Sequence, residues 1–231
     1  MSKKKKHTKE AGVENVDKAL SNAEHFIEEN QKPITTAVAI ILAALALFMG
    51  VKKLYIIPTE EEAQSLMFNA EKYFEADSFR LALYGDGNNY GFEDIIDNYK
   101  ITKSANLAKY YAGICNLKMG EFDLAIDYLE SYKIKEKMLA SVVYGAIGDA
   151  YSEMDDLDAA LKYYIKATDV KNNEFTTPIY LMKAAIVNEA LGDYESALKN
   201  YQLIKEEFKD TEQGDQIDKF ITRAEAMLAK Q

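Results

Sequence analysis

The side chains that could carry out chemistry are few in this 231-residue chain. It has two histidines, His7 and His25, and one cysteine, Cys115, which is too little material for a histidine-based metal site or a cysteine-rich zinc site. Cys115 falls on an apolar side of its predicted helix, with no histidine in the domain around it, which indicates a buried structural thiol rather than a nucleophile. We therefore predict a protein that is not an enzyme, with no catalytic residue, no metal site and no cofactor.

The segment 85–91 (GDGNNYG) deserves a test as a calcium loop, because its ligand-type side chains alternate. Such a loop needs Asp or Asn at alternate positions and a closing bidentate Glu. Asp86 and Asn88 fit, but a tyrosine and an aspartate occupy the next and the closing positions, and the Gly-Lys-Ser/Thr of a phosphate loop is absent. We expect a glycine-capped break before a helix over 92–99. An ion-binding or enzymatic role for this loop is the alternative, which a calcium titration tests.

The remaining carboxylate clusters and the charge balance also point away from catalysis. The runs Glu60–Glu62 and Asp155–Asp156 are predicted to be solvated turns rather than catalytic pairs. A formal net charge of −10 argues against nucleic acid as a partner. We expect no small-molecule substrate either. The arrangement of the predicted helices is therefore the better guide to function.

Charge and hydropathy divide the chain into three parts: 1–33 with net charge +1, 34–58 with two lysines and no acid, and 59–231 with net charge −13. The middle part holds eighteen uncharged residues, Ile34 to Val51, about 27 Å as a helix, against a bilayer core of roughly 30 Å. We predict an uncleaved transmembrane signal-anchor helix over 34–57, in contact with lipid and ended by Pro58. A buried core helix and a cleaved signal peptide are the alternatives.

Lysines on the amino-terminal side, including Lys3–Lys6, predict a cytoplasmic amino terminus and place residues 59–231 outside the cytoplasm. The arm 1–33 also contains an apolar seam with spacing 3, 4, 3, 4, formed by Val13, Val16, Leu20, Ala23 and Ile27. This seam predicts a short amphipathic helix, either a short coiled coil or an interfacial helix on anionic lipid.

Residues 59–231 repeat themselves. Segments starting at Lys109, Tyr144 and Leu181 each read as an apolar-periodic helix, a short Gly/Asp turn and a second helix with an early alanine. A degenerate copy starts at Leu66, and the turn residues of the four copies are Asp77, Gly120, Asp155 and Gly192. A final amphipathic helix over 215–230, with Ile217, Phe220, Ile221, Ala224 and Leu228 inward, is predicted to cap the array.

These units resemble tetratricopeptide repeats, whose period is 34 residues. The resemblance rests on small residues at position 8 of each copy, on an alanine at position 20 of every copy, and on bulky residues at position 24 of the last three. In order these are Ala70, Gly113, Gly148 and Ala185; Ala82, Ala125, Ala160 and Ala197; and Leu129, Tyr164 and Tyr201. The resemblance implies an all-α solenoid of about four repeats over 59–231 that binds protein partners.

In tetratricopeptide repeats the first helices line a concave groove, and the resemblance places ten residues of this chain there. They are Met67, Phe74, Tyr110, Ile114, Leu117, Asp149, Glu153, Ile179, Met182 and Ile186. We hypothesise an apolar groove, with the two carboxylates at its middle, that receives a partner helix or extended segment. Alternatively, the membrane-proximal helix or the capping helix covers part of it.

The order of arm, span and outward-facing repeats is similar to the bacterial inner-membrane proteins typified by the ancillary subunit of the Sec translocon. That resemblance implies a protein of the bacterial inner membrane with its repeat domain in the periplasm. It also implies a scaffold that assists secretion or folding of envelope proteins, with the translocon or a chaperone as partner. An adaptor for envelope assembly or cell division, acting in outer-membrane protein insertion or cell-wall synthesis, is the alternative, because repeat folds serve many functions.

Overall fold

The computed structural model describes residues 21–230 apart from 22, 23, 27, 136 and 171. It divides into two compact units, Met1–Pro58 and Thr59–Gln231. The five residues of the predicted amphipathic seam lie outside the described part of the chain. Every regular element within the described residues is a helix, which confirms the predicted all-α class.

The amino-terminal unit contains helix α2 (Gln31–Val51), followed by a five-residue π-helical segment, Lys52–Ile56. The helical run is long and apolar enough to cross a membrane by length and composition, and no residue of α2 is buried. The prediction that Pro58 ends the helix is wrong, because helical structure continues into α3 (Ile57–Glu75). Pro58 is the second residue of α3, and the π-helical segment rearranges the hydrogen bonds at the place where proline supplies no N–H.

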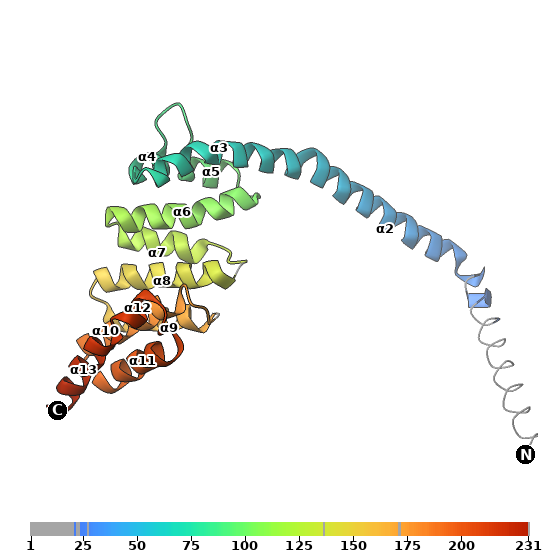
Figure 1. Cartoon of the computed structure of the whole chain (residues 1–231). Helices are drawn as coiled ribbons and strands as arrows, with labels where there is room; N and C mark the ends of the chain where they lie inside the picture. Colours follow the sequence, from blue (N-terminus) through green and yellow to red (C-terminus); the bar gives the residue numbers. More distant parts are fainter. Residues whose placement is uncertain (1–20, 22–23, 27, 136, 171, 231) are drawn as a thin grey trace, which may run out of the picture. The chain divides into compact units, whose positions relative to one another are not determined.

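The larger unit stacks helical pairs on one another (Figure 1). The pairs are α3 with α4 (Phe79–Tyr84), α6 (Lys103–Met119) with α7 (Phe122–Ser131), α8 (Lys137–Glu153) with α9 (Leu157–Asp169), and α10 (Thr177–Ala190) with α11 (Tyr194–Glu207). We refer to them as the first to fourth repeats.

The tight turn inside each repeat has the same backbone conformation. Asp77, Gly120, Asp155 and Gly192 have φ values of 53°, 82°, 62° and 81°. These are left-handed conformations that glycine adopts freely and aspartate tolerates better than most residues. All four turn residues predicted from the sequence therefore occupy equivalent positions.

Small residues are required where the two helices of a repeat cross. Ala82, Ala125, Ala160 and Ala197 all have no exposed surface. A Cβ atom on Gly148 would lie 2.7 Å from the ring of Tyr164, and one on Gly113 would lie 2.5 Å from Cγ of Leu129. In the second and third repeats, glycine at position 8 is thus the counterpart of the bulky residue at position 24.

The first repeat departs from this plan after its second helix. Helix α4 has only six residues and is followed by the 85–91 loop and helix α5 (Phe92–Asn98), close to the helix predicted over 92–99. Leu83, Phe92 and Ile95 are fully buried in one core with residues of α6, including Cys115. The buried thiol predicted at Cys115 is confirmed, and burial raises its pKa to about 12.

Glu60 links the start of the repeat domain to its second repeat. Its carboxylate accepts hydrogen bonds from the backbone N–H groups of Lys103 and Ser104 and from the Ser104 hydroxyl, at the amino end of α6. Burial raises the pKa of Glu60, but these hydrogen bonds outweigh it and leave the pKa below its usual value. The predicted solvated turn at Glu60–Glu62 is therefore wrong, because the run lies in α3 and its first residue caps another helix.

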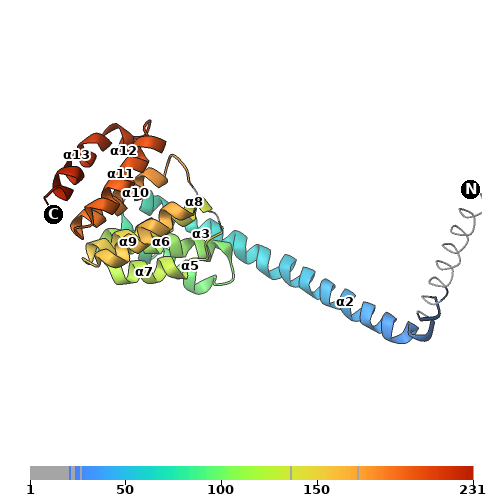
Figure 2. The ribbon, with the colours of Figure 1, turned by 90° about the horizontal axis from the view of Figure 1, so that it is seen from below.

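The array ends in α12 (Glu212–Asp215) and α13 (Ile217–Leu228), which lie along α11 (Figure 2). Ile217 and Ala224 of α13 are buried against α11, and Phe220 and Ile221 are partly buried. The predicted cap is confirmed except at Leu228, which is 38% exposed because it lies in the last turn of the helix, beyond the buried stripe.

Candidate functional site

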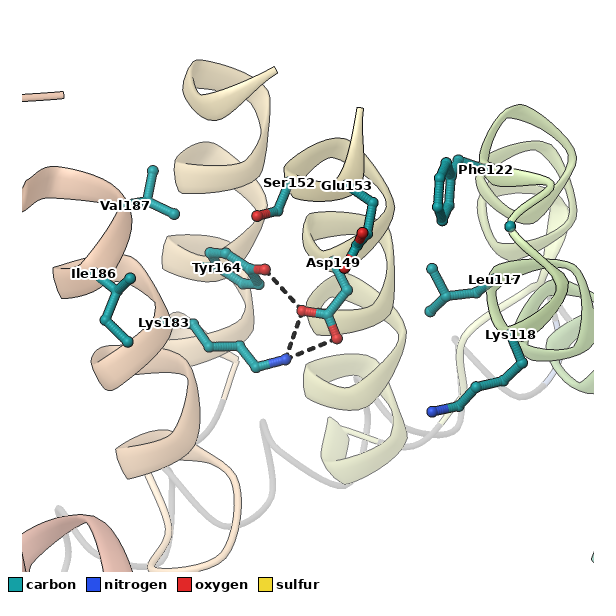
Figure 3. A pocket seen from close by; sticks show the side chains of 11 residues that line it. Leu117, Lys118, Phe122, Asp149, Ser152, Glu153, Tyr164, Lys183, Ile186 and Val187 are labelled. Carbon is teal, nitrogen blue, oxygen red and sulfur yellow. Dashed lines mark hydrogen bonds and ion pairs between the residues drawn. The ribbon is translucent and has the colours of Figure 1, made fainter. Parts of the chain in front are cut away.

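The candidate site is a groove of about 560 Å³ across the second, third and fourth repeats. Its walls come from the carboxyl-terminal half of α6 and the start of α7 on one side and from α10 on the other, with α8 and α9 between them (Figure 3). The lining residues are Leu117, Lys118, Gly120, Phe122, Asp149, Ser152, Glu153, Tyr164, Lys183, Ile186 and Val187.

Asp149 of α8 is the polar centre of this groove. Lys183 Nζ lies 2.6 Å and 2.8 Å from its two carboxylate oxygens, and the Tyr164 hydroxyl donates a hydrogen bond of 2.7 Å to Oδ1 (Figure 3). Burial and the adjacent Asp149 charge raise the pKa of Tyr164, which keeps its hydroxyl protonated as a donor. The carboxylate is thus neutralised in place by a fixed cation.

Aromatic packing next to this ion pair holds α10 close to α8 and α9. The Tyr164 and Tyr180 rings are stacked with centroids 6.4 Å apart. A Cβ atom on Gly145 would lie 2.0 Å from the Tyr180 ring, so glycine lets α10 approach α8. Lys183 Nζ lies 5.7 Å from the centre of the Tyr164 ring, which adds a cation–π contact.

The structure brings four of the ten predicted groove residues together: Leu117, Asp149, Glu153 and Ile186. The other six lie elsewhere. Met67 and Phe74 belong to the core of the first repeat, Tyr110 and Ile114 pack on the core between the second and third repeats, Met182 packs on the carboxyl-terminal core, and Ile179 is an exposed residue of α10.

The sequence reasoning missed seven of the lining residues, and two of these, Lys183 and Tyr164, contact Asp149 directly. Lys183 follows Asp149 by 34 positions, which is one repeat period. Other polar links have nearly the same spacing: Tyr128 to Glu93, Tyr163 to Glu130, Asn172 to Glu207 and Arg223 to Glu189. Complementary polar residues one period apart were therefore an available signal for contacts between successive repeats.

The 85–91 loop holds its carboxylate in internal hydrogen bonds. Asp86 accepts from the Tyr73 hydroxyl, from the backbone N–H groups of Asn88 and Asn89, and from the Asn89 amide, at 2.7 to 3.0 Å. These donors hold the pKa of Asp86 well below its usual value. Over the part of the chain that the structure describes, no group of three or more His, Cys, Asp or Glu residues could hold a metal ion.

Models described as tetratricopeptide repeat match residues 107–135, 142–174 and 180–211, which correspond to the second, third and fourth repeats. No curated protein matches the chain significantly.

One solved structure with a similar fold contains the TPR-like repeats, nearly identical to one another, of a kinesin light chain-like protein from Podosopora anserina. It matches at 11% sequence identity and a TM-score of 0.57, and the match covers 74% of this chain and 89% of that one. A MamA protein matches at 16% identity and a TM-score of 0.52, covering 74% and 93%. The chain therefore contains tetratricopeptide repeats in a helical solenoid, a fold whose repeats suggest a protein–protein interaction scaffold.

Proposed function

We propose that this protein is a single-pass, membrane-anchored scaffold that holds a segment of a partner protein in the groove around Asp149. The observation that carries the proposal is the groove itself, a concave surface built from three successive repeats, with both apolar and charged side chains in its lining and a neutralised polar centre. Leu117, Phe122 and Ile186 offer apolar contacts, and Lys118 and Glu153 offer charged ones. An amphipathic helix or an extended segment suits such a surface.

The membrane anchor in this proposal is the helix predicted over 34–57. Its large apolar residues are exposed, for example Leu47 at 71% and Leu54 at 81%. Exposed apolar area of this extent is stable in lipid and unfavourable in water. With the amino terminus in the cytoplasm, the repeats would lie in the periplasm and assist secretion or folding of envelope proteins near the Sec translocon.

Photocrosslinking in cells tests the groove and identifies its occupant. A photoreactive residue replaces Ile186, which is 46% exposed in the groove wall, and as a matched control Lys162 on the exposed side of α9. We expect a crosslink to a translocon subunit, a chaperone or a secreted protein from position 186 only. Crosslinks to outer-membrane insertion or cell-wall machinery would favour the envelope-adaptor function, and equal crosslinking from both positions would contradict the groove.

A separate experiment tests the orientation. Cys115 is buried with a raised pKa, so an introduced cysteine at the exposed Asn172 should be the one thiol of the folded domain that reacts readily. We expect Asn172→Cys to react with a membrane-impermeant reagent once the outer membrane is permeabilised. Labelling only after lysis of the inner membrane would reverse the orientation and place the partner in the cytosol.

A further inference from the structure

Lysines gather at one edge of the repeat domain, outside the groove. A hollow of about 760 Å³ lies where the α5–α6 and α7–α8 linkers meet. Five lysines and one carboxylate, Asp97, are among its lining residues. We call this surface the basic edge, and its lysines are Lys100, Lys103, Lys109, Lys133 and Lys135.

Side-chain hydrogen bonds fix the two linkers that form the basic edge. The Asn106 amide donates to the Lys133 carbonyl at 3.1 Å and accepts from the Lys133 N–H at 2.9 Å. Lys109 Nζ lies 3.4 Å from the Ser131 carbonyl oxygen. The lysines therefore project from a built surface. Lys100 Nζ lies 3.8 Å from Oδ1 of Asp97 in an exposed ion pair, and Lys103, Lys133 and Lys135 are exposed to solvent.

The opposite edge of the same domain has the reverse charge. It consists of the tight turns inside the repeats, which read EADS at 75–78, GEFD at 120–123, DDLD at 155–158 and GDYE at 192–195. Each of these segments contains two or three acids and no base. In a domain of net charge −13, the lysines of the basic edge are thus a local inversion of sign, which points to an anionic ligand.

The basic edge is also the end at which the chain arrives from the predicted span. Glu60 binds the backbone at Lys103 and Ser104, and only Pro58 and Thr59 separate Glu60 from Ile57, the last residue of the predicted span. Three peptide units bridge at most about 11 Å, whatever the angle between the two units. Ile101, 58% exposed beside Lys100 and Lys103, adds an apolar side chain of the kind that enters an interface.

We propose that the basic edge binds the headgroups of anionic phospholipids in the membrane that anchors the chain. Each lysine close to an anionic surface strengthens association by about fivefold, an effect that salt weakens. Such binding would restrict the repeat domain at the bilayer surface and leave the acidic turn edge away from the lipid. The inference rests on the proposed membrane anchoring.

Hydrogen exchange of the full chain in nanodiscs tests this proposal. We expect the amides of 100–109 and 131–135 to exchange more slowly in phosphatidylglycerol–phosphatidylcholine nanodiscs than in phosphatidylcholine alone, with the difference removed by high salt. Lys100→Glu combined with Lys133→Glu should weaken the association by at least about 25-fold. The matched variant, Lys162→Glu with Lys199→Glu, changes the net charge equally on exposed faces of α9 and α11 and should retain it.

The lipid assignment would be overturned by equal exchange in both nanodiscs, by equal loss in both double variants, or by protection by inorganic phosphate in phosphatidylcholine nanodiscs. Protection that appears only with an acidic protein partner would also overturn it. A chain that inserts into neither nanodisc contradicts the membrane anchoring instead, so the two failures can be told apart.

Discussion

The third and first repeats solve the same packing problem with different residues. In the third repeat, Tyr164 stands at position 24 and crosses Gly148 at position 8. In the first repeat the corresponding residues are Asp86 and Ala70, because α4 ends at Tyr84 and position 24 falls in a loop. Ala70 is fully buried, and Asp86 accepts four hydrogen bonds at the surface. A polar loop thus takes the place of a helical turn.

The space available at position 8 differs from repeat to repeat. In the third repeat only hydrogen fits on the Cα atom opposite the Tyr164 ring, and in the first repeat the methyl group of Ala70 fills the space where no ring is present. The fourth repeat buries an alanine, Ala185, together with Tyr201, so a tyrosine at position 24 does not by itself require glycine. The rule of small residues at this position therefore hides two local requirements, which single substitutions can separate.

The largest effect is expected for Gly148→Ala. The added Cβ would meet the Tyr164 ring at 2.7 Å, so we expect a loss of about 2 kcal/mol in the free energy of unfolding, in spite of alanine's higher helix propensity. The measurement is denaturant-dependent labelling of Cys115, whose burial makes it a reporter of repeat unfolding in the full chain.

Two further variants control this prediction. In a Tyr164→Ala background Gly148→Ala should lose most of its effect, because the crossing ring is gone. Ala70→Gly in the first repeat should also destabilise, by about 1 kcal/mol, although it is the reverse substitution. Alanine is therefore expected to be the better residue at position 8 of the first repeat and glycine the better one in the third. Stabilisation by Gly148→Ala would contradict the packing comparison.

The next largest loss of stability is expected for Glu60→Ala. The first repeat caps α6 from a distance through this carboxylate, whereas α9 of the third repeat is capped locally by Asp156, which accepts from the Ala159 N–H. Removing a cap costs about 1 kcal/mol. The exposed Glu61→Ala is the matched control and should have little effect.

The contribution of Glu60 should also depend on pH. Because the folded state lowers the pKa of Glu60, the stabilisation is present above the unfolded pKa and is lost as pH falls through the folded pKa, which lies below the unfolded one. The difference in stability between the parent and Glu60→Ala should therefore shrink in acid. A difference that stays constant down to complete protonation would show that the cap does not depend on charge.

Lys183→Met should have a smaller effect on the stability of the third and fourth repeats. Lys183 and Asp149 retain 37% and 33% of their side-chain exposure, so solvent screens the pair and we expect a loss of about 0.5 kcal/mol. Partner binding should suffer more than stability, because Asp149 would face the groove without its cation. Lys199→Met is the control, and equal effects of the two variants on binding would exclude a role for the pair.

The smallest effect on global stability is expected for Asp86→Ala. The change removes the acceptor of the Asn88 and Asn89 N–H groups, so those two amides should exchange faster. The unfolding midpoint should change little, because the core of Leu83, Phe92 and Ile95 remains. Asp97→Ala is the exposed control, and unchanged exchange in Asp86→Ala would contradict the proposed role of the loop carboxylate.

The sequence by itself determined the features that depend on local periodicity. The helix class, the four turn residues, the buried Cys115 and the capping helix all follow from apolar spacing and from the few residues that tolerate a left-handed turn. The long apolar helix could be read in the same way, because eighteen uncharged residues need no tertiary context to be recognised.

Only the tertiary structure decided which side chains share a surface. Four of ten predicted groove residues line one groove, because small changes in how the repeats stack turn a residue such as Met67 from the concave surface into the core. The pairing of Asp149 with Lys183, the capping of α6 by Glu60 and the basic edge all join residues from different repeats or linkers. Their proximity depends on inter-repeat packing, which the pattern within one helix does not specify.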